Sequence, residues 1–195
     1  ERAIVSYDIA IDMIDHSMPE HWYVHYVRGI AHDRLGSWEL GLRDFDRALS
    51  LSPNQFQVLN YVGYSLVERG ERLKEALSMI ERAVLAQPKA GHIIDSLGWV
   101  QFRLGYYKLA IVNMERAVEL MATDPVVNNH LGDVYWAVGR KTEARFQWLR
   151  ALSFVTGSID SEDINPIRMQ LKLDIGLDAV LAEEGAQPIK MADGN

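Results

Sequence analysis

The sequence of 195 residues contains no cysteine, which excludes disulfide bonds and thiolate metal sites. It also lacks an excess of basic residues, because 20 lysines and arginines stand against 27 acidic residues, a formal net charge of −7. Phosphate binding needs a basic stripe, so we expect no nucleic-acid partner. The apolar runs are too short to cross a bilayer, so we expect no membrane insertion by these residues. Hydrophobic residues make up 48 % of the sequence, which suits a globular domain with a sizeable core.

Small residues recur along the sequence every 34 or 35 residues. One column of glycines is Gly29, Gly63, Gly98 and Gly132, and a second is Gly36, Gly70, Gly105 and Gly139. Two further columns are Gly41, Ala76, Ala110 and Ala144, and Ala48, Ala83, Ala117 and Ala151. A column of large apolar residues is Phe45, Ile80, Met114 and Trp148. A fixed period of this length indicates stacked structural repeats.

Each column has a mechanical interpretation. Small residues let two helices approach closely, and the second glycine column suits the left-handed residue that ends a helix. Pro53 and Pro88 fall where a second helix should end and the next first helix should begin. The single extra residue between Gly70 and Ala76 is expected in a turn, where insertions are tolerated. Each period therefore predicts a hairpin of two helices of about 12–16 residues.

These columns resemble the tetratricopeptide-repeat (TPR) consensus, which has a small residue at position 8, Gly at 15, Ala at 20, an aromatic at 24, Ala at 27 and Pro at 32. Repeat one departs with Gly41 at position 20, and repeats three and four have Ala122 and Thr156 in place of the proline. The resemblance implies an all-α fold, a right-handed superhelical solenoid of helical hairpins with a C-terminal capping helix.

We expect a single TPR domain over residues 1–184. A partial repeat over 1–14 resembles a second helix through Ala3, Tyr7 and Ala10. Complete repeats are expected at about 20–53, 54–88, 89–122 and 123–156, before a polar turn at Gly157–Asp163. A capping helix at about 161–184, with a break at Gly176, covers the last apolar face, and 185–195 is expected to be a flexible tail. Because residue 1 is Glu rather than Met, we expect the chain to be either a processed product or a piece of a longer protein.

The resemblance also implies that positions 2, 5, 9 and 12 of each first helix line a concave, peptide-binding groove. Among the side chains at those positions, the candidate ligand contacts are Tyr23, Tyr26, Asp33, Asn60, Tyr64, Asp95, Trp99, Phe102, Asn129, Asp133 and Trp136. Aromatic residues would anchor a partner, and amides would pair with an extended backbone. The alternative is that the aromatics pack between repeats and that the residues at position 5 form only a solvated wall.

Several kinds of chemistry are not supported. His21, His25 and His32 share a helix face, but His25 and His32 occupy positions that pack inside a TPR hairpin, so no metal is expected. The chain shows no nucleophile elbow or phosphate loop, and we expect neither a cofactor nor an enzyme. The clamp of lysines and asparagines by which some TPR proteins hold chaperone tails is also missing. We interpret the column of Arg47, Arg82, Arg116 and Arg150 as outward surface charges rather than an anion-binding ridge.

A narrower resemblance covers roughly residues 90–155, above all 94–99, 124–136 and 139–152. These segments are similar to the C-terminal module of large, envelope-associated TPR proteins of Gram-negative bacteria. That resemblance implies a bacterial protein of the periplasm or envelope, and a cytoplasmic location stays open.

The sequence therefore predicts a scaffold or adaptor that binds a segment of another protein in its concave groove. The alternative is a structural module that self-associates, as a homodimer, through exposed apolar end helices. The helix over 1–14 would supply such a surface, because Ile4, Tyr7 and Ile11 have no preceding helix to cover them.

Overall fold

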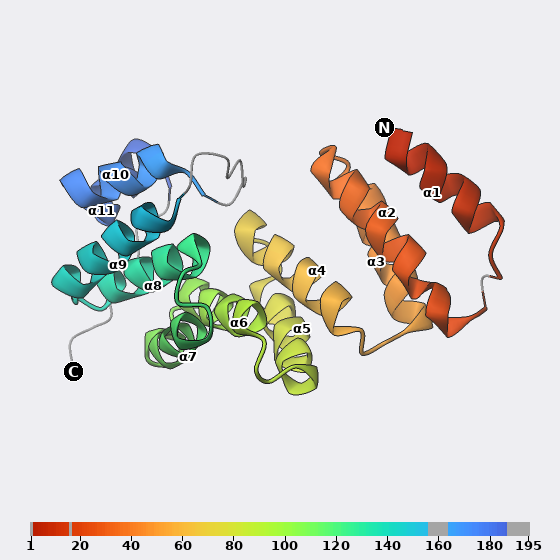
Figure 1. The fold of residues 1–195 in the computed structure, drawn as a ribbon, viewed down its shortest axis with the longest axis horizontal. Helices are drawn as coiled ribbons and strands as arrows, with labels where there is room; N and C mark the ends of the chain where they lie inside the picture. The colour runs from red at the N-terminus through yellow and green to blue at the C-terminus, as the bar shows by residue number, and fades with distance from the viewer. Residues whose placement is uncertain (1, 16, 156–163, 187–195) are drawn as a thin grey trace. The chain divides into compact units, whose positions relative to one another are not determined.

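A computed structural model describes residues 2–15, 17–155 and 164–186 of the chain. It divides into two compact units, Glu1–Gln87 and Pro88–Asn195, and each is described by itself. The described residues form helices and turns and contain no strand, so the predicted all-α class is confirmed (Figure 1). The expected turn at Gly157–Asp163 and all but two residues of the expected tail lie outside the described residues.

The first unit contains two helical hairpins and one further helix. α1 (Arg2–Asp12) and the short 3-10 helix η1 (Pro19–His21) precede the hairpin of α2 (Trp22–Arg34) and α3 (Trp38–Leu51). The second hairpin consists of α4 (Phe56–Arg69) and α5 (Leu73–Ala86). Figure 1 shows α1 beside α2, with which it is in contact.

The second unit repeats this arrangement. Its hairpins are α6 (Gly91–Arg103) with α7 (Tyr107–Leu120), and α8 (Pro125–Ala137) with α9 (Lys141–Phe154). α10 (Pro166–Ile175) and α11 (Leu177–Glu183) follow, and α10 packs against α9. The expected break lies at Gly176, whose φ of +87° few residues other than glycine adopt. In the described part of the chain, no helix is long and apolar enough to span a membrane.

Each hairpin closes where a glycine of its first helix meets a large residue of its second. A Cβ atom on that glycine would lie 2.6 Å from Phe45 at Gly29, 2.7 Å from Ile80 at Gly63, 2.8 Å from Met114 at Gly98 and 2.4 Å from Trp148 at Gly132. These four large side chains are buried, as are the column alanines of the second helices. The periodic columns therefore make up the core of each hairpin.

The turns follow the second glycine column. Gly36, Gly70, Gly105 and Gly139 all have positive φ, between +68° and +81°. The extra residue of the second repeat lies in its turn as expected, and Arg72 there takes a left-handed φ of 46°. Within the repeats, a four-residue connection links each second helix to the next first helix. In the last of these connections, the Asp124 carboxylate caps α8 by accepting hydrogen bonds from the backbone N–H groups of Val126 and Val127.

The face of α1 differs from the expectation. Ile11 is buried, and Ile4 and Tyr7 are half-buried, so the expectation that these residues lie uncovered is wrong for Ile11. The exposed large apolar side chains here are instead Val5 and Ile9 of α1 and Met13, which directly follows its last residue. They follow one another at intervals of four residues and so form one stripe along the helix.

Candidate functional site

The eleven predicted contact residues all lie on the first helices of the hairpins, α2, α4, α6 and α8. Their exposure differs widely. Tyr23 is exposed, and half-buried side chains are those of Tyr26, Asp33, Asn60, Tyr64 and Asn129. Buried side chains are those of Asp95, Trp99, Phe102, Asp133 and Trp136. The same repeat position is thus open in one helix and covered in another.

An aromatic cluster surrounds the one exposed residue of the set, Tyr23, whose exposed fraction is 56 %. Its ring lies edge-on to Trp22, with centroids 5.5 Å apart, and 6.3 Å from Tyr26. Tyr26 contacts Tyr61 of α4 edge-on at 6.0 Å and continues the cluster into the next repeat. Offset and edge-on contacts of this kind hold rings in fixed orientations. Tyr23 is therefore an exposed ring on a firmly packed base.

Asp33 is engaged within its own unit. It accepts hydrogen bonds from the Tyr61 hydroxyl at 2.9 Å and from Arg69 at 2.7 Å. Burial, and then the bond to Asp33, raise the pKa of Tyr61. The Arg69 guanidinium also lies over the Trp38 ring, 4.2 Å from its centroid. Asp33 therefore joins α2 to α4.

Asn60 has a buried polar atom without a described partner. Its Oδ1 has no hydrogen bond to any residue that the structure describes, although the side chain as a whole is only half-buried. A buried acceptor without a donor costs free energy. The choice between a backbone-binding ladder and a solvated wall stays open at this position.

Trp99, the most prominent predicted anchor, is 9 % exposed and forms part of the packing between α6 and α8. Its ring stacks on His130 at a centroid distance of 4.2 Å and on Phe102 at 5.0 Å. His130 Nδ1 is also 2.9 Å from the Asp95 carboxylate. These four residues join the third repeat to the fourth.

The three predicted residues of α8 are covered by α10 and α11. Lys172 Nζ donates to both carboxylate oxygens of Asp133, at 2.7 and 2.8 Å, and to Asn129 Oδ1 at 2.9 Å. The Trp136 indole N–H donates to Asp178 at 2.8 Å. Burial lowers the pKa of the Lys172 ammonium, and the Asp133 carboxylate opposes that shift. We call Asn129, Asp133 and Trp136 the α8 seat.

The arginine column has a role that the sequence interpretation missed. Arg82 donates to the carbonyl oxygen of Pro53, Arg116 to that of Pro88 and Arg150 to that of Ala122, at 2.5, 2.6 and 2.9 Å. In TPR numbering, position 26 of one repeat donates to position 32 of the repeat before it. The arginines therefore connect successive repeats rather than serving only as outward charges.

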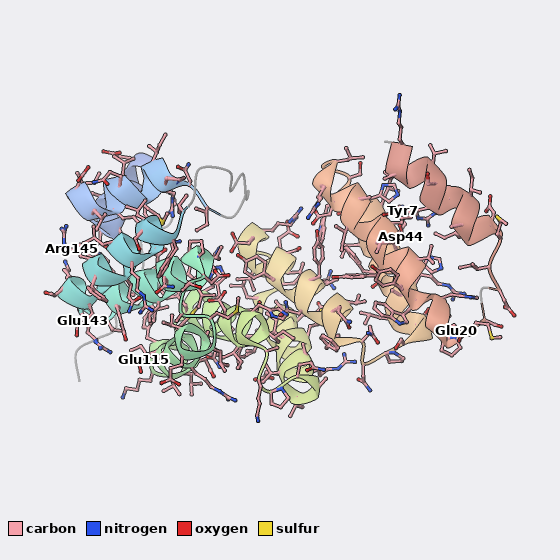
Figure 2. All side chains as sticks on the ribbon, in the orientation of Figure 1. Tyr7, Glu20, Asp44, Glu115, Glu143 and Arg145 are labelled. Carbon is pink, nitrogen blue, oxygen red and sulfur yellow. The ribbon has the colours of Figure 1, made fainter. Side chains whose placement is uncertain are left out.

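The histidine cluster lies in a charged network inside the first hairpin. Asp44, labelled in Figure 2, accepts from Arg28 at 2.6 and 2.8 Å, and Arg28 also reaches Asp8 of α1 at 2.8 Å. His25 and His32 lie 3.7 and 3.9 Å from Asp44. Burial is the main cause that lowers the pKa of His25, against the raising influence of Asp44. Among the residues that the structure describes, no group of three or more histidines and carboxylates is arranged to hold a metal ion.

Sequence reasoning also missed Lys172 and Asp178. One signal could have indicated them, because position 9 reads Ile30, Tyr64, Trp99 and then Asp133, a carboxylate in an otherwise apolar or aromatic column. A lysine between Leu171 and Leu173 is the matching irregularity in the capping segment.

No family model matches the chain. A TPR repeat-containing protein of Pseudomonas aeruginosa is 31 % identical over 115 residues, which cover 59 % of this chain and 19 % of the relative. The chain thus spans about a fifth of the length of that relative.

Solved structures with a similar fold include three proteins. PilW, a widely conserved type IV pilus biogenesis factor, has a TM-score of 0.71 at 20 % identity, over 94 % of this chain and 82 % of its own. PilF of Pseudomonas aeruginosa has a TM-score of 0.68 at 18 % identity, over 94 % and 88 %. MamA of Desulfovibrio magneticus RS-1 has a TM-score of 0.60 at 26 % identity, over 74 % and 79 %. These likenesses establish the fold.

Proposed function

Because this chain is a tetratricopeptide-repeat protein, we propose that it is a non-catalytic protein-binding module that holds a segment of a partner protein on the concave face of its first helices. The observation that carries the proposal is the exposed Tyr23 ring on its packed aromatic base in α2. A tyrosine that is more than half exposed contributes little to the core of its own hairpin. The ring is available to a partner.

The chemistry of this surface suits a peptide or protein segment. Tyrosine and tryptophan bury a large area on binding and lose little conformational entropy, which is why they dominate binding hot spots. The net charge of −7 disfavours a nucleic acid in this role.

Of the predicted residues, the proposal assigns direct contact to Tyr23, Tyr26, Asn60 and Tyr64 in the first unit. Asp33, Asp95, Trp99 and Phe102 instead hold neighbouring first helices in place through the contacts described above. Replacing Trp99 would therefore damage packing before it reported on binding. Tyr23 is the better probe.

The test is selection of binding peptides from a display library, followed by affinity measurements with the best peptide. Tyr23→Ala should weaken its binding about 30-fold, the effect of losing roughly 2 kcal/mol at a hot spot. Tyr106→Ala is the matched control, because Tyr106 is 46 % exposed but precedes α7, a second helix. Equal affinity of the Tyr23 variant and the wild type would place the binding surface elsewhere.

A second candidate function is self-association through α1. The stripe of Val5, Ile9 and Met13 has exposed fractions of 59, 57 and 81 %, and exposed apolar stripes of this kind favour pairing. Ile9 also occupies the position that carries arginine in the four complete repeats. We expect Ile9→Lys to shift a dimer to a monomer in sedimentation velocity, while Val112→Lys, at an exposed site of α7, does not. A monomeric wild type would end this candidate.

A further inference from the structure

The α8 seat is occupied by the chain's own C-terminal helices through specific polar contacts. Lys172 fills the space between Asn129 and Asp133, and Asp178 receives the Trp136 indole N–H. Gly176, between α10 and α11, lies so close that a Cβ atom there would be 2.5 Å from the Trp136 ring. The residues that hold α10 and α11 are thus at repeat positions 5, 9 and 12, the positions that the TPR resemblance gives to ligand contact.

The α8 seat favours a positively charged side chain next to Asp133. Lys172 is completely buried, and Asp133 also accepts a hydrogen bond from the Trp148 indole N–H at 2.9 Å. A buried ion pair stabilises a structure no better than a well-packed apolar pair of the same volume, and its best-attested use is to fix register and partner choice. An apolar side chain in place of Lys172 would leave the Asp133 carboxylate buried without its ammonium. The pair therefore favours one helix register over others.

Apolar contacts supply the remainder of the recognition. Ile164 and Met169 are buried in a cluster with Ala151 of α9, and Leu177 and Val180 of α11 are buried as well. Arg145 of α9, labelled in Figure 2, donates to the Leu173 carbonyl oxygen at the C-terminal end of α10. Two short amphipathic helices joined by a glycine, with one lysine on the apolar face of the first, meet all these requirements.

The connection to α10 is longer than the others. Four residues join each second helix to the next first helix at 52–55, 87–90 and 121–124, whereas eleven residues, 155–165, separate Phe154 from Pro166. A longer connection holds its helix at a lower effective concentration and with less geometric constraint. By its length alone, this connection therefore fixes α10 against α9 less closely than a four-residue connection would.

We infer that the α8 seat is a helix-binding site that exchanges its occupant. In place of α10 and α11 it accepts a segment of a partner protein that forms two short helices with a glycine between them, as at Gly176, and that carries a lysine over Asp133 and a carboxylate six residues later beside Trp136. This deepens the proposed protein-binding function, on which it rests, by stating the chemistry of one partner. The chain's own C-terminal helices then limit access to the seat until a competing helix replaces them.

The experiment uses the full chain and a fluorescein-labelled peptide of its own residues 164–186 as the probe. Lys172→Met in the chain weakens the resident helix but leaves the Asp133 carboxylate in the seat. We expect this variant to bind the peptide at least tenfold more tightly than the wild type does. A peptide that carries the same Lys172→Met change should bind neither chain.

Two further variants keep the test decisive. Asp178→Ala serves if Lys172→Met fails to fold, because it removes only the hydrogen-bond partner of the Trp136 indole, from an exposed position. It should raise the peptide affinity of the chain by less than Lys172→Met does. Gln170→Ala, on the exposed face of α10, is the matched control and should bind like the wild type. No gain in either seat variant, or equal binding of the peptide without lysine, overturns the inference.

The result also separates this inference from the proposed function. Tyr23→Ala should leave uptake of the helix peptide unchanged, because Tyr23 belongs to the other unit. Equal affinity of Tyr23→Ala and the wild type for the display-selected peptide, together with the expected helix uptake, would count against the first-unit surface alone. Failed helix uptake with normal Tyr23-dependent binding would count against the seat alone.

Discussion

Substitution of one glycine tests whether the hairpins are held by the fit between the glycine column and the large residues. In Gly132→Ala the new Cβ atom would lie 2.4 Å from two atoms of the Trp148 indole, Cδ1 and Nε1. The indole is rigid and completely buried, and its N–H is bonded to Asp133. It can move only by breaking that bond or by separating α8 from α9.

The magnitude follows from opposing contributions. Overpacking of a closed core costs about 1–3 kcal/mol, and disturbing a hydrogen bond to a buried carboxylate costs about 1.5 kcal/mol or more. Replacing glycine by alanine inside a helix returns about 1 kcal/mol. The net expectation is a loss of about 2 kcal/mol, or roughly 4–8 °C in Tm for a chain of this size.

Gly98→Ala is the internal comparison, because it is the same substitution at the same repeat position. Its Cβ atom would meet Met114, at 2.8 Å from Cγ, and an unbranched methionine side chain can change rotamer to relieve the contact. We expect its stability to fall by no more than about 1 kcal/mol. Thermal and urea unfolding, followed by far-UV circular dichroism and tryptophan fluorescence, measure both variants. Equal midpoints for the two would refute the reasoning.

Two further predictions concern the contacts that sequence analysis did not anticipate. Arg116→Ala should lower the free energy of unfolding by about 1 kcal/mol, because it removes the hydrogen bond to the Pro88 carbonyl oxygen. The control, Arg103→Ala at an exposed site of α6, should change the free energy of unfolding little. Similar losses for the two variants in chemical denaturation would contradict the role of Arg116 in joining the repeats. His25→Leu should reduce the loss of stability between pH 7 and 5. The pKa of His25 in the folded chain lies below its value of 6.5 in the unfolded chain, so protonation favours unfolding as the pH falls through that range. An unchanged pH profile of Tm would show that His25 is not responsible.

The fold was predictable because its determinants are local and repeated. Gly29 and Phe45 meet within one hairpin, and the same pair of positions recurs in all four complete repeats. The positive φ of Gly36 likewise depends only on the turn that it occupies. Even the extra residue of the second repeat could be placed, since Arg72 lies in a turn where no packed helix has to shift.

The candidate site was predictable only in its positions. The repeat register places Tyr23 and Trp99 on first helices, but exposure depends on what the neighbouring element presents. His130, 31 residues further along the chain, stacks on Trp99, whereas Tyr23 has no such cover over most of its surface. The pairing of Asp133 with Lys172 joins residues 39 positions apart through a connection longer than any within the repeats. Such choices depend on tertiary packing, which no periodicity encodes.

The arginine column also bears on how α1 can pack. Position 26 donates to the carbonyl at position 32 of the preceding repeat in three of the four complete repeats. At the equivalent position of α1 stands Ile9, whose side chain has no hydrogen-bond donor. Whatever packs against that side of α1 must therefore be held by apolar contact with Val5, Ile9 and Met13 rather than by this bond. One position of the repeat thus distinguishes a junction fixed by polar contacts from one that depends on apolar burial.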